Sequence, residues 1–139
     1  MARTTTTSRR EIAFIDSIDA CFPYRDEVAA RASVCEGAAI SDNAALMVAY
    51  ELAFAPDGIA AQLRLALLDL LVAQRPSELV MAAKPVVQAL ILGDTPSKEA
   101  TDLLLLHCRH EPISFNALNI LSDCSPEYAS LAEEIRSRA

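Results

Sequence analysis

The order of hydrophobic and polar residues along this chain predicts helices almost throughout. Apolar side chains recur at intervals of three and four residues, which is the spacing of amphipathic helices. Ser, Thr or Asp precedes most of these runs and Pro or Gly follows them, and both are typical signals of helix boundaries. The predicted helices begin near Ser8, residue 24, Ser41 or Asp42, Asp57, Pro76 with Ser77, Thr95, Ser114 and Ser125.

The second predicted helix spans about residues 24–36. Val28, Ala32 and Cys35 share one of its faces, and we expect this face to be buried. Gly37 predicts the end of the helix, because glycine accepts the left-handed conformation that often follows a last helical turn.

The fourth predicted helix, which starts after Asp57, carries the broadest apolar surface, and we expect it to be the central helix. Arg64 and Asp69 interrupt its leucines. We expect each at a solvent edge, because buried charges are costly unless paired, and the alternatives are that either pairs across helices or lines a pocket. In the fifth predicted helix, Pro85 indicates a kink or a split near Lys84.

Together these elements predict an all-α fold, a compact bundle of about seven or eight short helices. The nearly even spacing of starts at about 57, 77, 95 and 114 leaves stacked helical hairpins as an alternative arrangement. Residues 1–7 are polar and lack periodicity, so we expect a disordered basic arm there and a single helical domain over residues 8–139.

Composition adds an apolar surplus to this picture. Hydrophobic residues make up 53% of the 139 residues, although aromatic residues make up only 5%. Such a surplus indicates a partner surface, a dimer interface or an apolar pocket. The formal net charge of −7 disfavours binding to nucleic acid and to anionic membrane surfaces, since both are negatively charged.

Neither a membrane span nor a signal peptide is expected. The best apolar stretch, residues 59–73, contains Arg64 and Asp69, and a transmembrane helix needs about 20 apolar residues. The N-terminal residues lack the long apolar segment of a signal peptide. With neither segment, we expect a cytoplasmic protein. None of its four cysteines lies in a C-x-x-C pair, and in a reducing cytosol we expect them to be plain buried side chains.

The most reactive cluster is His107, Cys108 and His110, which Cys124 could join. Histidine and cysteine are the usual ligands of zinc, but their spacing matches no standard zinc motif. Cationic side chains near a helix C-terminus also complement the helix dipole, and His107 shares a row with Leu103. We therefore expect no metal site and keep a Cys/His metal-dependent protein as a less favoured hypothesis.

The sequence offers no catalytic or cofactor-binding motif. The three glycines, Gly37, Gly58 and Gly93, stand at predicted helix ends and form no phosphate-binding loop. We expect a non-enzymatic protein without a cofactor. If the helices enclosed a pocket, Tyr50, Glu51 and Asp69 would be its candidate polar groups.

The leading functional hypothesis is a protein–protein interaction module, namely a helical adaptor, regulator or small chaperone. It would bind a protein partner or itself through an apolar helical surface, and we expect a homo-oligomer. The alternative is a helical bundle that binds a small apolar ligand in its core. A DNA-binding regulator is disfavoured, because the helix after residue 41 contains Asp42 and Glu51 and no basic residue.

Overall fold

The computed structural model describes only helices and the short connections between them. The described residues are 9, 13–14, 27–54, 59–110, 120, 122, 129–130 and 133–134, with the side chains of 108–110 left out. They contain five helices, α2 (Glu27–Ile40), α3 (Asp42–Ala53), α4 (Ala61–Gln74), α5 (Glu78–Ile91) and α6 (Lys98–His110), and no strand. The all-α prediction is confirmed.

The number of helices in the described parts is five, where seven or eight were expected for the whole chain. The other predicted helices start near Ser8, Ser114 and Ser125, in ranges that are almost entirely outside the described residues. The residues that are described within them, such as Phe14 and Ile120, are helical.

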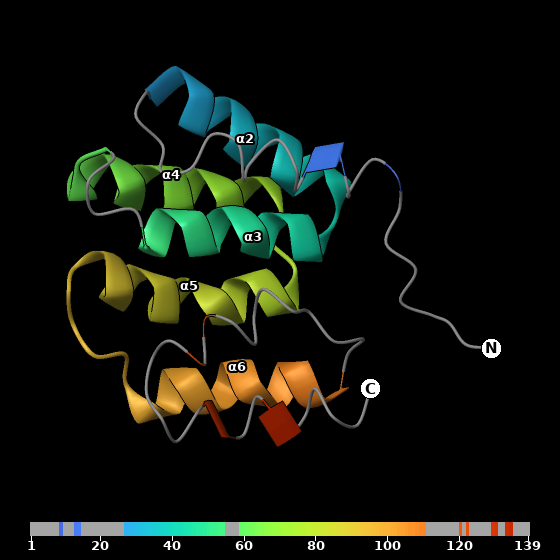
Figure 1. The fold of residues 1–139 in the computed structure, drawn as a ribbon, viewed down its shortest axis with the longest axis vertical. Coiled ribbons are helices and arrows are strands. Elements are labelled where there is room, and N and C mark those ends of the chain that lie inside the picture. The colour runs from blue at the N-terminus through green and yellow to red at the C-terminus, as the bar shows by residue number, and fades with distance from the viewer. Residues whose placement is uncertain are drawn as a thin grey trace.

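The five helices form successive layers (Figure 1). α2 lies at one end, followed by α4 and α3, then α5, with α6 at the other end. α3 packs against α2, α4 and α5, whereas α6 packs chiefly against α5. The two outermost layers, α2 and α6, therefore each have a side without a described helix.

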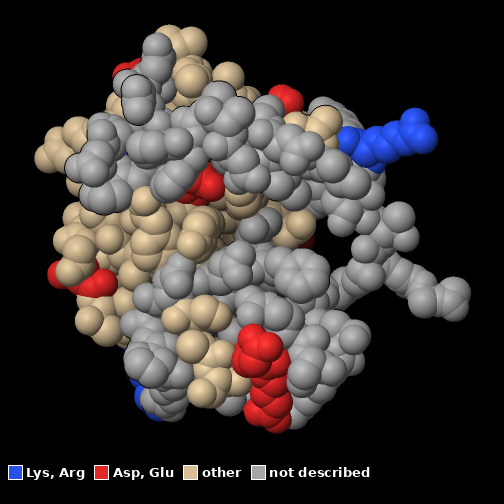
Figure 2. All heavy atoms as spheres, in the orientation of Figure 1, with Lys and Arg blue, Asp and Glu red and all other residues tan. Residues whose placement is uncertain are grey.

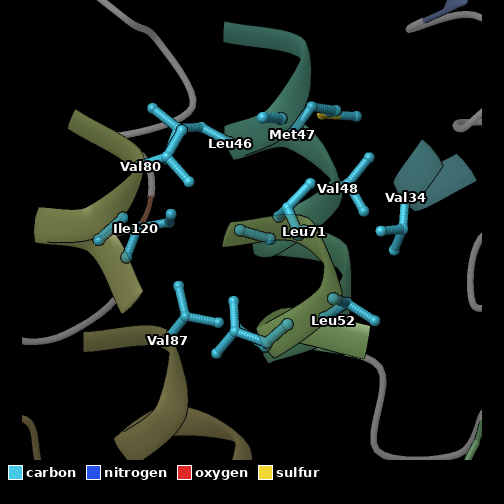
Figure 3. Close-up of a cluster of buried hydrophobic side chains, with 14 of the residues drawn as sticks. Val34, Leu46, Met47, Val48, Leu52, Leu71, Val80, Val87 and Ile120 are labelled. Carbon is cyan, nitrogen blue, oxygen red and sulfur yellow. The ribbon is translucent and has the colours of Figure 1, made fainter. Parts of the chain in front are cut away.

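The most buried helix is α3, not the expected α4. Nine of the twelve α3 residues are buried, whereas α4 buries four of fourteen. Small residues explain the difference, because Ala44, Ala45 and Ala49 let neighbouring helices approach α3 from several sides. Figure 3 shows α3 side chains between those of α2, α4 and α5. The labelled residues are Val34, Leu46, Met47, Val48, Leu52, Leu71, Val80, Val87 and Ile120.

Helix α2 is rotated relative to the expectation. Val28, Ala32 and Cys35 are exposed, and the buried side of α2 is formed instead by Ala30, Val34, Gly37 and Ala38. The sequence allowed either face, because alanines stand on both. The prediction of the buried face was therefore wrong.

Gly37 does not end α2, which continues to Ile40. A Cβ atom at Gly37 would lie 2.8 Å from Val48 Cγ2 and 3.1 Å from Phe14 Cζ. Glycine is required here because α2 and α3 approach closely, not because the chain turns.

Serine side chains cap three of the helices. Ser41 Oγ accepts a hydrogen bond from the Ala44 N–H at 3.0 Å, as expected for the start of α3. Ser77 caps α5 in the same way. At α6 the cap is Ser97, whose Oγ accepts from Ala100 N–H at 3.1 Å, and not the predicted Thr95.

Two further boundary predictions have different outcomes. α4 begins after Ala60, which has no side-chain cap, so the predicted cap Asp57 does not start it. At the end of α5, Gly93 adopts a φ of +78°, with hydrogen bonds from Gly93 N–H to Leu90 and from Asp94 N–H to Ala89. This arrangement is a Schellman motif, and it confirms the predicted glycine stop.

Pro85 does not split α5, because the helix runs without a break from Glu78 to Ile91, and the alternative of a kink near Lys84 stays a prediction. Pro85 lies on the exposed side of the helix. Proline has no N–H to donate to the Met81 carbonyl, four residues earlier. Because this side of the helix is exposed, water can solvate that carbonyl instead.

Candidate interaction surface

Several large apolar side chains are exposed although many others are buried in the described core. Four of them belong to α5, its C-cap and α6, and one belongs to α2. The exposed fractions are 53% for Met81, 54% for Leu92, 46% for Leu103, 47% for Leu106 and 77% for Val28. Isolated exposed apolar residues are common on proteins, so their arrangement matters more than their number.

Met81, Pro85, Gln88 and Leu92 form one exposed row on α5, which we call the α5 ridge. Their spacing of four, three and four residues places them within an arc of about 60° on a helix. The ridge is about 16 Å long, or three helical turns. It carries no charged side chain, and the opposite side of α5 is buried in the core.

Helix α6 exposes a second, shorter apolar pair. Leu103 and Leu106 stand one turn apart and are both about half exposed. Glu99 and Asp102 are exposed on the same helix, and Asp102 Oδ2 accepts a hydrogen bond from Lys98 Nζ at 2.6 Å. The pair therefore has two acidic residues near it on α6, one of which is paired with Lys98.

Charges near the α5 ridge are partly neutralised. Lys84 Nζ lies 3.1 Å from Asp69 Oδ1, which links α5 to α4 at the surface. On the face shown in Figure 2, acidic side chains stand out among uncharged ones, and Lys and Arg appear at the rim. The described part of this face is thus largely uncharged, with more acidic than basic side chains.

The Cys/His cluster is only partly visible. His107 is half-buried on α6, but the side chains of Cys108, His110 and Cys124 lie outside the described residues. Within the described ranges, no group of three or more His, Cys, Asp or Glu residues is placed to hold a metal ion. The metal hypothesis stays a prediction about residues that the structure does not describe.

The three proposed pocket residues lie in different environments. Tyr50 is half-buried, with its ring centroid 4.9 Å from that of Phe54. Glu51 is buried in the interior, whereas Asp69 is exposed and paired with Lys84. Asp69 thus occupies the solvent edge that the sequence predicted, and a pocket lined by these groups stays a prediction.

Arg64 is buried, so the expectation that it lies at a solvent edge was wrong. Its Nε donates to the Ile59 carbonyl at 3.0 Å and its Nη1 donates to the Leu52 carbonyl at 2.8 Å. Burial lowers the pKa of the Arg64 guanidinium from its ordinary value. The sequence spacing could have indicated that Arg64 is buried, because residues 64, 67, 68 and 71 share one side of the helix.

A second arginine follows the end of α4 and acts similarly. Arg75 Nη1 donates to the Ala38 carbonyl at 2.7 Å, and its Nε pairs with the Asp42 carboxylate. Ala38 belongs to the last turn of α2 and Asp42 to the first turn of α3. The two arginines give α4 a structural role in holding the ends of α2 and α3.

None of the described helices has the length and apolar character needed to cross a bilayer. Comparisons with protein-family models, with curated proteins and with solved structures found no match to this chain.

Proposed function

We propose that this chain is a non-enzymatic protein–protein interaction module of the cytoplasm. In this proposal a helical adaptor, regulator or small chaperone binds a protein partner, or another copy of itself, through an apolar helical surface. The observation that carries the proposal is the pair of exposed apolar rows on α5 and α6. Helical surfaces with apolar residues at this spacing are a common means of binding another helix or a groove.

The packing of the described core supports this assignment of the surface. The largest fully buried side chains of the described core include Leu46, Leu52, Leu67 and Leu104, and α5 contributes Val86 and Val87 at 0% exposure. The leucines and methionine of the two rows are therefore additional to the residues that fill the interior. Leaving such side chains in water costs free energy, about 25 cal/mol per Å² of apolar area, which binding would recover.

We also propose that the layers form a short stack of helical pairs rather than a closed bundle. The support is the order of layers in Figure 1, in which α2 and α6 are the farthest apart. In such a stack, each helix pair contacts mainly its neighbours, and the end layers keep surfaces for partners.

The test is a comparison of the natural chain with a variant that lacks the apolar rows. The variant carries Met81→Ser, Leu92→Ser, Leu103→Ser and Leu106→Ser. Because all four side chains are about half exposed, circular dichroism should show the same helix content in both proteins. Sedimentation velocity between about 1 and 200 µM would measure self-association, and crosslinking in cell extract would measure partner capture.

We expect the natural chain to self-associate or to crosslink specific proteins, and the variant to lose this binding. A natural chain that stays monomeric and crosslinks only what the variant also crosslinks would contradict the proposal.

A further inference from the structure

The α5 ridge has acidic side chains beyond both of its ends. Glu78 stands one turn before Met81, and Asp94 stands two residues after Leu92. Both are exposed, and neither forms an ion pair with a described residue. Within α5, all of which the structure describes, the only Lys or Arg is Lys84, and it is paired with Asp69. The surface is therefore uncharged in the middle and negative at each end.

This charge pattern disfavours the same surface of a second copy as the occupant. If two α5 helices packed antiparallel, Glu78 of one copy would approach Asp94 of the other. If they packed parallel, each acidic residue would approach its own equivalent. Like charges meet in either orientation, and such contacts are unfavourable.

We infer that the α5 ridge binds a cationic amphipathic helix of a partner protein. The inference rests on the proposed function and deepens it by naming the partner's chemistry. The partner helix presents an apolar face of about three turns, matching the length of the ridge. Lys or Arg side chains at both ends of that face approach Glu78 and Asp94.

The side chains of the ridge suit this occupant. Met81 is flexible and polarisable, so it can adapt to the shape of an apolar partner. Gln88, in the middle of the row, can form hydrogen bonds with polar groups of the partner without adding charge. Pro85 adds apolar surface and presents no backbone N–H to the partner.

The experiment uses the full chain and two synthetic helical peptides of about 20 residues. The first peptide carries a three-turn leucine face with lysines at both ends. The second is identical except that glutamates replace the lysines. Fluorescence anisotropy of each labelled peptide, at about 50 and 300 mM NaCl, gives the Kd for the natural chain and for its variants.

Three variants identify the surface. The apolar variant carries Met81→Ser with Leu92→Ser, and the charge variant carries Glu78→Gln with Asp94→Asn. The matched control is Val28→Ser, which removes an even more exposed apolar side chain from α2, a layer separated from α5 by α4 and α3. All of these positions are exposed, so folding is expected to be unaffected and is checked by circular dichroism.

We expect the lysine peptide to bind at least about tenfold more tightly than the glutamate peptide, with weaker binding at high salt. The apolar variant should weaken its binding about tenfold or more and the charge variant about fivefold, while Val28→Ser leaves it unchanged. The inference would be overturned if the two peptides bound equally or if the lysine peptide did not bind. It would also be overturned if Val28→Ser weakened binding of the lysine peptide as much as the apolar variant does. If the chain still self-associates or crosslinks partners through α6, the proposed function survives that result.

Discussion

The guanidinium of Arg64, in the first turn of α4, donates a hydrogen bond to the Leu52 carbonyl near the end of α3, with 2.8 Å between Nη1 and O. The last carbonyls of a helix have no partner within it and lie at the negative end of its dipole. A buried cation at this point satisfies one carbonyl and complements the dipole. The same side chain also holds Ile59, which precedes α4. Arg64 therefore fixes the end of α3 relative to the start of α4.

We expect Arg64→Ala to lower the free energy of unfolding by about 2–4 kcal/mol, because the substitution leaves buried carbonyls of Leu52 and Ile59 without their donor. The control is Arg31→Ala, which removes an exposed ion pair with Glu27 and should change stability by no more than about 0.5 kcal/mol. Urea denaturation of both variants measures the difference. Similar stability of the two variants would show that Arg64 does not hold these helix ends.

Gly37→Ala should also destabilise the protein, although alanine is the better helix former by about 1 kcal/mol. The new methyl group would lie 2.8 Å from Val48 Cγ2 and 3.3 Å from the Ala44 carbonyl oxygen. Overpacking of this kind typically costs about 1–3 kcal/mol, so we expect a net loss. Denaturant midpoints compare the variant with the natural chain.

A second variant tests whether steric overlap with Val48 causes the loss of stability in Gly37→Ala. Val48→Ala removes the Cγ2 atom that the new methyl group would meet. In the double variant the cost should be smaller than the sum of the two single costs, because each change compensates for the other. Additive costs, or a stabilised Gly37→Ala protein, would exclude a close contact at this position.

Gly37 and Arg64 show which features of the fold the sequence could predict. Helix type followed from apolar spacing, and the serine caps marked several starts, since both signals are local. The role of Gly37 depends on Val48, eleven residues away on another helix, and the burial of Arg64 depends on carbonyls of α3 and of the connection before α4. Periodicity placed Arg64 on the same side of α4 as Leu67, but it did not report the carbonyls that Arg64 meets, because contacts between helices decide such roles.

The sequence predicted that an apolar surface exists, but not which residues form it. Composition indicated an apolar surplus, but apolar residues occur all around α5, so their positions alone do not identify the exposed side. Met81 and Leu92 are apolar like the buried Val86 and Ile91, and they differ from them in the side of the helix on which they lie. That direction is set by the packing of α5 against α3, α4 and α6.

Two residues, Thr95 and Ser97, are candidates for the N-cap of α6. Ser97 Oγ accepts the Ala100 N–H, whereas Thr95 lies two residues before the cap. We expect Ser97→Ala to cost about 1 kcal/mol, as for other N-cap losses, and Thr95→Ala to cost almost nothing. Thermal unfolding followed by circular dichroism compares the two. A larger loss for Thr95→Ala would support the boundary expected from the sequence instead.

Gly93 ends α5 with a φ of +78°, and a Cβ atom there would meet nothing within 4 Å. Any cost of Gly93→Ala therefore comes from backbone conformation and not from packing, and we expect about 1–2 kcal/mol. Gly93→Asn should cost less, because asparagine tolerates the left-handed conformation better than alanine. Chemical denaturation of both variants measures this order. Equal losses for alanine and asparagine would mean that the left-handed conformation does not determine the stability of this helix end.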